Sequence, residues 1–249
     1  MGGRAALGDG MNSPAAIPAG TEVGVTVNYY RYQEPGLMEL AGNKYGARYS
    51  YSGADRSGRS GRVELIASYG ELQYAGSGVI NHVPDFSGEV RIFMGSDIGV
   101  SHRLTLASFG GLGCRALFND LRGKSSTGAT GYRRESYYIY LPVGMSGRYV
   151  LAEGWRVGGN VEFDFLLRGQ QYSKLSDVGT GLENVRNEQR SGYAWRARLS
   201  FEKSGFSVGP WVTYWKISDS SPAYMTSGSK VIEPRNNTIE MGLELGTRF

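Results

Sequence analysis

The last twelve residues of the chain alternate between apolar and polar side chains. Ile239, Met241, Leu243 and Leu245 fall on one parity, whereas glutamate, glycine and arginine residues occupy the other. Successive side chains of a strand point to opposite faces, so this period of two puts one strand between an apolar medium and a polar one. About ten segments repeat the pattern, which predicts an all-β fold. The predicted strands span residues 21–33, 44–52, 62–74, 88–96, 101–118, 135–149, 155–170, 191–202, 206–217 and 238–249.

Two all-β architectures fit this alternation: a soluble sandwich with the apolar parity in its core, and a transmembrane barrel with that parity against lipid. The central parts of the predicted strands carry no charge on the apolar parity. Several segments are longer than about ten residues, as tilted membrane strands are, and their apolar faces begin or end in aromatic residues, as membrane girdles do. We therefore predict a transmembrane, antiparallel, up-and-down β-barrel of about ten strands.

Connector lengths alternate along the predicted barrel and give it an orientation. The longer connectors are residues 34–43, 75–86, 119–134, 171–190 and 218–236, and the shorter ones are 53–61, 97–100, 150–154 and 203–205. Outer-membrane barrels have short periplasmic turns and longer extracellular loops. With an even number of strands, both termini of the barrel are then expected in the periplasm.

The barrel is expected to occupy residues 21–249, after a flexible lead-in over residues 1–20. This lead-in is rich in glycine, alanine and proline. It lacks the apolar core of a secretory signal peptide, so an exported protein would have lost such a signal already.

The C-terminus and three internal segments resemble known outer-membrane proteins. An alternating last strand that ends in Phe249 resembles the C-terminal signal by which bacterial outer-membrane β-barrels are recognised for insertion. Residues 34–38, 111–115 and 140–144 resemble a group of uncharacterised proteobacterial outer-membrane β-barrel proteins. The resemblance covers most of residues 21–249, although Cys114 stands where an aromatic residue is expected. It implies a bacterial outer-membrane location, with outer-membrane lipid, lipopolysaccharide and the barrel-insertion machinery as partners, and it implies no particular activity.

The polar parity of the strands predicts a lumen filled with charge. A barrel of about ten strands is narrow, and unpaired charges in a narrow interior are costly, so we expect arginine–carboxylate pairs across it. A narrow water-filled channel for small solutes, lined by the same residues, is the alternative. The predicted lumen network consists of Arg48, Glu64, Glu89, Arg91, Arg115, Glu162, Asp164, Arg168, Arg196, Arg198, Glu202, Glu240 and Glu244. Pro142 lies within a predicted strand and predicts a bulge there.

Composition argues against several other classes of function. With one cysteine and two histidines, the chain holds no internal disulfide, and a cysteine-based or multi-histidine metal site is not expected. The net charge of +4 is spread evenly, unlike the clustered bases of nucleic-acid-binding proteins. No cofactor is predicted. Arg122, Lys124, Arg133 and Arg134 are candidate contacts for lipopolysaccharide phosphates or another anion, and a solvated loop of mixed charge is the alternative.

An enzymatic role is weighed because ten-stranded barrels include the omptin proteases. Those enzymes carry an Asp–His and an Asp–Asp pair at the outer rim. Here His82 and Asp85 are the only candidates for an acid–base pair in a long loop, and no adjacent Asp–His or Asp–Asp pair occurs in any long loop. We therefore predict a non-enzymatic barrel with a structural or surface-interaction role. The alternatives are a narrow channel and, less favoured, a hydrolase with a site at the rim.

Overall fold

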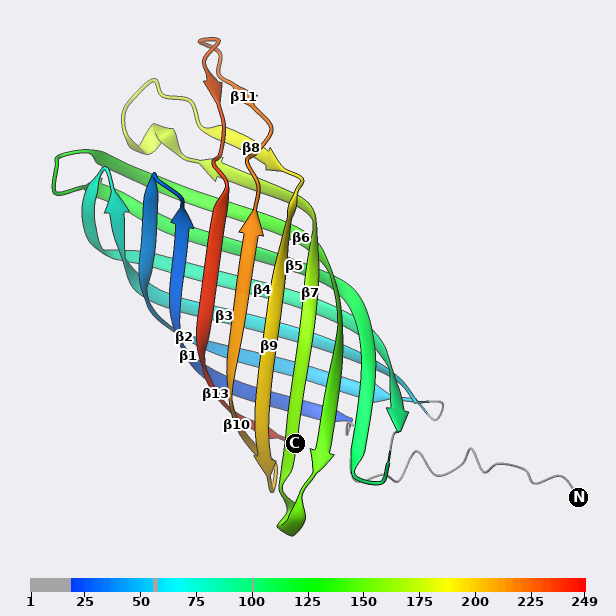
Figure 1. The fold of residues 1–249 in the computed structure, drawn as a ribbon. Helices are drawn as coiled ribbons and strands as arrows, with labels where there is room; N and C mark the ends of the chain where they lie inside the picture. Colours follow the sequence, from blue (N-terminus) through cyan, green and yellow to red (C-terminus); the bar gives the residue numbers. More distant parts are fainter. Residues whose placement is uncertain (1–18, 56–57, 100) are drawn as a thin grey trace, which may run out of the picture.

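A computed structural model describes residues 19–55, 58–99 and 101–249. In this part of the chain, ten long antiparallel strands close into a tilted barrel (Figure 1). The predicted fold is therefore confirmed. The long strands are β1 (Gly20–Glu34), β2 (Met38–Ala54), β3 (Arg59–Gly76), β4 (Gly78–Gly99), β5 (Leu104–Lys124), β6 (Thr130–Val150), β7 (Arg156–Ser173), β9 (Gly192–Lys203), β10 (Phe206–Ile217) and β13 (Asn236–Arg248). Residues 1–18 of the predicted lead-in lie outside the described residues, and β1 already begins at Gly20.

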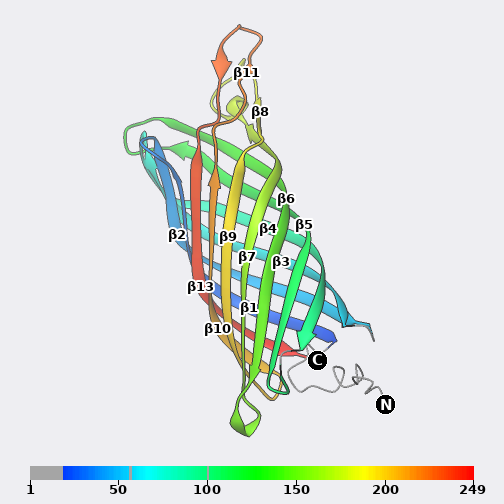
Figure 2. The ribbon, with the colours of Figure 1, turned by 45° about the vertical axis from the view of Figure 1, so that its right-hand side comes forward.

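Each long strand pairs with the next one along the chain, and β1 pairs with β13 to close the wall. β8 (Val185–Gln189) pairs with the far end of β7, above β9, and the small hairpin of β11 (Ala223–Tyr224) and β12 (Lys230–Val231) stands beyond the barrel (Figure 2). We call this side the loop end. The opposite side, where β1 begins and β13 ends, is the turn end. Two 3-10 turns, Ala152–Gly154 and Leu175–Asp177, complete the elements.

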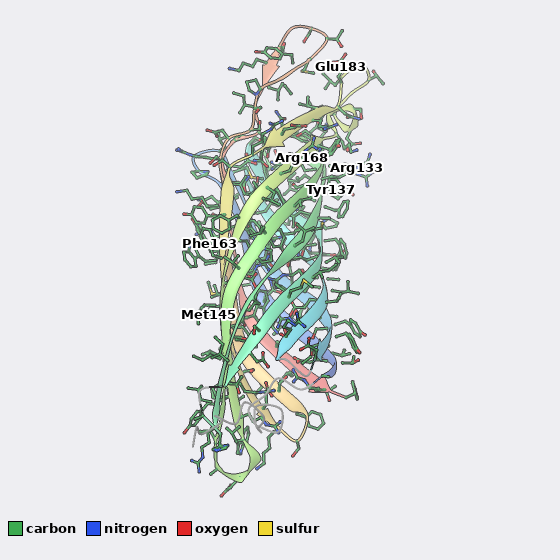
Figure 3. The ribbon with its side chains drawn as sticks, turned by 90° about the vertical axis from the view of Figure 1, so that its right-hand side faces the viewer. Arg133, Tyr137, Met145, Phe163, Arg168 and Glu183 are labelled. Carbon is green, nitrogen blue, oxygen red and sulfur yellow. The ribbon has the colours of Figure 1, made fainter. Side chains whose placement is uncertain are left out.

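The apolar parity of the strands faces outward and the polar parity faces the lumen. On β13, the Leu243 side chain is 53% exposed, whereas the neighbouring Glu244 is 6% exposed. Figure 3 shows Met145 and Phe163 on the outside of the wall. A soluble sandwich would bury such side chains, so that alternative is wrong. Among the described residues, no helix is long and apolar enough to cross a membrane.

The strands extend further at the loop end than the sequence predicts. Residues 34–43 and 75–86 are almost entirely strand rather than long loops: residues 35–37 alone separate β1 from β2, and Ser77 alone separates β3 from β4. The backbone ladders continue there, but the outward side chains become polar, as at Gln73 and Asn81, which share a hydrogen bond of 2.9 Å. The apolar alternation that revealed the strands therefore ends before the strands do.

The predicted bulge lies close to Pro142 but not at it. Pro142 stays in the ladder opposite Asp164, whereas the register shifts between Ile139 and Tyr140. Ile139 faces Arg168 and Tyr140 faces Leu166, which leaves Leu167 as the extra residue on β7. An extra residue reverses the parity of a strand beyond it. The inward side chains of β6 are therefore as predicted, and those at the loop end of β7 are not.

Candidate functional site

The lumen at the turn end is held by ion pairs around Arg48 of β2. Arg48 donates from Nη2 to Glu244 of β13 at 2.6 Å and to Glu22 of β1 at 2.5 Å. Arg198 of β9 donates to the same Glu244 at 2.9 Å, and Arg248 donates to Glu22 at 2.5 Å. Because each carboxylate accepts from two arginines, four strands are tied together across the interior.

Arg91 of β4 forms the next layer. It donates from Nη1 to Glu64 of β3 at 2.9 Å and from Nη2 to Glu162 of β7. Glu64 also lies 3.5 Å from Arg48 Nη1, so the two layers are connected. The Arg91 guanidinium stacks 4.6 Å from the centre of the Phe93 ring, which shields one of its faces from water.

Arg196 of β9 bridges the barrel at its middle. It donates from Nε to Asp164 at 2.7 Å, and from Nη1 and Nη2 to Glu89 of β4 at 3.0 and 2.6 Å. Arg115 of β5 donates to Glu240 of β13 at 2.5 Å. Bidentate, charge-assisted hydrogen bonds of this kind are among the stronger polar contacts in proteins.

Aromatic side chains fill the lumen above Arg196. Tyr140 donates to Glu89 at 2.6 Å and packs edge-on against Trp215, whose ring lies 5.1 Å away. Tyr138 stacks against the same Trp215 ring, with the ring centroids 6.4 Å apart. These three residues belong to a buried cluster, the aromatic plug, which consists of Leu117, Tyr138, Tyr140, Leu166, Ala194, Trp215 and Ile217. A second buried cluster contains Tyr30, Tyr32, Leu40, Leu72, Val83 and Leu121.

The structure thus places all but one of the predicted lumen residues in ion pairs inside the barrel, including Glu202, which accepts from Arg148. The exception is Arg168. Its side chain is 52% exposed and donates to Glu188 on the outside of the wall. The prediction for Arg168 is wrong because Leu167 is inserted into β7 and reverses the direction of the side chains that follow.

Several buried charges were not singled out from the sequence. Lys44 and Asp85 form a pair with no exposed side-chain surface, and Lys44 also donates to Ser87 at 3.1 Å. The inward parity of Lys44 was a signal for this role. The suggested pairing of His82 with Asp85 is wrong, because Asp85 faces the lumen while His82 Nδ1 lies 2.8 Å from Glu71 on the outside.

The four candidate anion contacts have different environments. Arg134 is buried and donates to Glu34 and Glu233, so its assignment as an exposed anion contact is wrong: β6 carries it into the interior, beyond the predicted limit of the strand. Arg122 is exposed and donates to Asp120 at 2.6 Å, and Lys124 is exposed near the end of β5.

Arg133, the fourth candidate, pairs with a carboxylate of the 3-10 turn at residues 175–177. It donates from Nη2 to Asp177 Oδ1 at 2.8 Å. The hydrogen bonds from Arg133 lower the pKa of Asp177 to about 2. The pair therefore stays ionised at any physiological pH and occupies the guanidinium that an external anion would need.

The space left in the lumen at the turn end and at the centre of the barrel is small and divided. A cavity of about 150 Å³ at the turn end and one of about 80 Å³ at the centre share Arg48, Arg91, Arg198 and Glu244 as lining residues. These volumes hold a few water molecules each. In the described part of the chain, no group of three or more histidine, cysteine or acidic side chains is placed to hold a metal ion.

A closed barrel with an apolar exterior and a charged interior decides the class. The chain has the fold of an outer-membrane β-barrel. No protein-family model matches the sequence, and no curated protein matches it either.

Solved structures of outer-membrane barrels are similar to this one at low sequence identity. The translocator domain of the autotransporter NalP from Neisseria meningitidis is 11% identical over 98% of this chain and 92% of that one, with a TM-score of 0.47. The β domain of the Bordetella autotransporter BrkA is 15% identical over 93% and 99%, with a TM-score of 0.41. Ail, the attachment invasion locus protein of Yersinia pestis, is 10% identical over 94% and 100%, with a TM-score of 0.35. These likenesses are remote, and the fold assignment rests on the barrel geometry itself.

Proposed function

We propose that this protein is a non-enzymatic outer-membrane barrel that conducts no solute and holds its loop-end hairpins in position for contacts at the cell surface. The observation that carries the proposal is the filled lumen. Arg91 and Arg196 connect β4 with β7 and β9 across the lumen through ion pairs, Arg48 joins β2 to β13, and the aromatic plug lies directly above them. A conducting pore would need an open path past these contacts.

The proposed orientation has the loop end outside the cell and the turn end in the periplasm. Short periplasmic turns and longer external loops are the usual arrangement in this class of barrel. Phe249 lies at the turn end, where its backbone oxygen accepts from Thr21 at 3.2 Å and its side chain is 78% exposed. This placement leaves the C-terminal residue accessible to the insertion machinery, which works from the periplasmic side.

The loop-end hairpins are fixed to one another, as a surface for recognition requires. The Ser126 backbone nitrogen donates to Val79 at 2.9 Å, and the hydroxyls of Ser125 and Thr127 donate to the Ser77 carbonyl at 2.9 and 2.7 Å. These contacts join the β5–β6 tip to the β3–β4 tip. A rigid surface loses less conformational entropy when it binds a partner.

A second set of contacts supports the opposite side of the loop end. Thr226, in the β11–β12 hairpin, donates its backbone N–H to Glu183 at 2.9 Å, and Glu183 precedes β8. Figure 3 shows Glu183 in the projecting part of the loop end. His82 and Asp85, the residues that suggested a hydrolase, lie on opposite sides of the wall, and this separation supports the non-enzymatic proposal.

Conductance across a planar lipid bilayer tests the proposal. The purified barrel, inserted at low density, is expected to show no stable current steps in 1 M KCl. Stable, salt-dependent single-channel steps would favour the channel alternative instead, with the two lumen cavities joined into a path. Protease protection in the same bilayers verifies that the barrel has inserted, so that a lack of current is not mistaken for a lack of inserted protein.

A further inference from the structure

The bulge in β7 creates a basic cluster on the outside of the barrel. Because Leu167 is the extra residue, Arg168 points outward, alongside Arg186 on the outer face of β8 and Arg190 directly after β8. The side chains of these three arginines are 52%, 48% and 74% exposed. All three donate to one carboxylate, Glu188.

The geometry of this cluster leaves positive charge in excess. Glu188 Oε1 accepts from Arg168 at 2.8 Å and from Arg186 at 3.1 Å, and its Oε2 accepts from Arg190 at 3.0 Å. Within the described cluster, three guanidinium groups face one carboxylate, which leaves two positive charges uncompensated. Hydrogen bonds from Arg168 and Arg190 lower the pKa of Glu188 to about 2, so this balance does not change over the physiological pH range.

The neighbouring side chains hold the guanidinium groups in place. With its amide oriented to suit its neighbours, Gln170 accepts from Arg186 at 3.0 Å and from Arg168 at 3.1 Å. The Arg186 guanidinium also lies 5.9 Å from the centre of the Tyr172 ring. The cluster is therefore organised before any ligand arrives, which lowers the entropy cost of binding.

Aromatic residues on the outer wall indicate the depth in the membrane at which the three arginines lie. Phe86, Phe118, Tyr137 and Tyr172 form a chain of ring contacts around the outer wall, with neighbouring centroids 5.7 to 6.0 Å apart. Aromatic girdles of this kind sit at the level of the lipid headgroups.

The strand register places the arginines at this level. Tyr137 faces Gln170 and Tyr172 faces Arg186, while Arg168 lies two pairs beyond Gln170 toward the membrane, opposite Ile139. Figure 3 shows Arg168 and Tyr137 near each other at the loop end of the wall. Directly below, Phe165 and Leu167 are outward and about half exposed, as side chains that contact acyl chains are.

We propose that Arg168, Arg186 and Arg190 bind the phosphate group of a lipid headgroup, with the acyl chains lying along Phe165 and Leu167. Guanidinium forks match phosphate oxygens in geometry and charge. Excess positive charge at the interface attracts anionic lipid. A free anion would use the same arginines but would gain nothing from the apolar wall beneath them, which is why we commit to a lipid.

Native mass spectrometry of the full-length barrel in detergent tests this site, with a diphosphorylated lipid A as the probe. Wild type is expected to retain one bound lipid. The variant Arg168→Gln/Arg186→Gln/Arg190→Gln is expected to bind at least about tenfold more weakly, which corresponds to about 1.4 kcal/mol. The same glycolipid without phosphates is expected to bind equally weakly to both proteins. If the triple variant does not fold, Arg190→Gln alone is expected to weaken binding several-fold, because its side chain is the most exposed of the three.

Arg31→Gln is the matched control. Arg31 also lies toward the loop end, on β1, but it has a one-to-one pair with Glu39 at 2.7 Å and no charge in excess. Its substitution is expected to leave lipid binding unchanged. Equal binding by wild type and the triple variant, or equal weakening by Arg31→Gln, would overturn the proposal. Displacement of the lipid by inorganic phosphate at the same concentration would also overturn it, because free phosphate would then be the ligand.

Discussion

At the scale of single residues, the lumen arginines differ in how much they contribute to the stability of the barrel. Arg196 has a side chain that is 10% exposed and forms ion pairs with three carboxylates, those of Glu89, Asp164 and Glu162. Arg198 is 28% exposed and donates to Glu244, which Arg48 also holds. Removing one partner of a buried pair is costly because the other charge is left without compensation. Arg196 and Arg198 both point inward from β9, so the sequence pattern does not distinguish them. The structure indicates that Arg196 contributes more to stability.

We expect Arg196→Ala to lower the free energy of unfolding by about 3–5 kcal/mol, and Arg198→Ala to lower it by roughly 1 kcal/mol or less. Urea titration of the barrel refolded into lipid vesicles measures both. Noisy current through Arg196→Ala, but not through Arg198→Ala, is expected in planar bilayers, since water enters to solvate the orphaned carboxylates. Equal losses of stability would show that the network redistributes its partners freely.

Glu233 provides a pH-dependent contact outside the membrane-spanning part of the barrel. It shares Arg134 with Glu34, so this site holds two carboxylates and one guanidinium. Burial, more than the nearby Glu34, raises the pKa of Glu233 above its ordinary value. A raised folded-state pKa stabilises the folded state most below the unfolded value of 4.5, and this contribution is lost as the pH rises through the folded-state pKa.

Wild type is therefore expected to unfold at a higher temperature at pH 5 than at pH 8, and Glu233→Gln is expected to reduce this difference. Differential scanning calorimetry at the two pH values, in the same detergent, makes the comparison. Asp219→Asn serves as the control, because Asp219 is an exposed acceptor for the Arg235 backbone. If Glu233→Gln shows the same pH dependence of stability as wild type, another titratable group causes that dependence.

At the scale of strands, the sequence carried most of the information on which side chains face lipid and little on where strands end. Alternation identified the outward face of β13, and all but one of the lumen charges that it predicted lie inside, because both depend only on parity. It missed the loop-end continuations of β1 to β4, where outward residues become polar. It predicted a bulge at Pro142 but missed the extra residue on β7: Leu166, Leu167 and Arg168 contain no glycine or proline, so nothing in their identity marks it.

The parity of β13 and β10 can be tested by depth. Leu243 lies near the middle of β13, and we expect Leu243→Arg to cost roughly 2–4 kcal/mol in lipid. Phe206 begins β10 at the turn end and also faces outward, so Phe206→Arg is expected to cost only about 0–1 kcal/mol. Folding titrations into vesicles of one lipid composition give both values. Equal costs would contradict a membrane centred on Leu243.

At the scale of the whole molecule, the two ends of the barrel have different interiors. The turn end contains a lumen cavity of about 150 Å³ and a ring of charged residues, whereas at the loop end the aromatic plug and a second apolar cluster lie beside a cavity of about 260 Å³ that Glu34 and Arg134 help to line. β8 and the β11–β12 hairpin project beyond the barrel at the loop end (Figure 2). In the proposed orientation, the loop end faces the outside of the cell and the turn end faces the periplasm.

Thiol labelling on intact cells tests that orientation. In a Cys114→Ala background, cysteines introduced at Ser227 and Gly179 are expected to react with a membrane-impermeant maleimide, because both lie at the loop end. A cysteine at Lys203, the last residue of β9 at the turn end, is expected to react only after the outer membrane is permeabilised. The reverse labelling pattern would show that the turn end faces the outside of the cell. Cys114 must be removed first because its side chain is exposed on the outer wall.

The pairing of β1 with β13 constrains the order in which this wall is assembled. Glu22 faces Arg248 and Gln33 faces Asn237, so one edge of β1 has its partner only when β13 is present. Until residues 236–248 have left the ribosome, β1 has one edge of unsatisfied backbone groups, which neither lipid nor an aqueous compartment tolerates for long without aggregation. The wall can therefore close only once residues 236–248 are available, and until then the open edge of β1 is exposed to pairing with the strands of other chains.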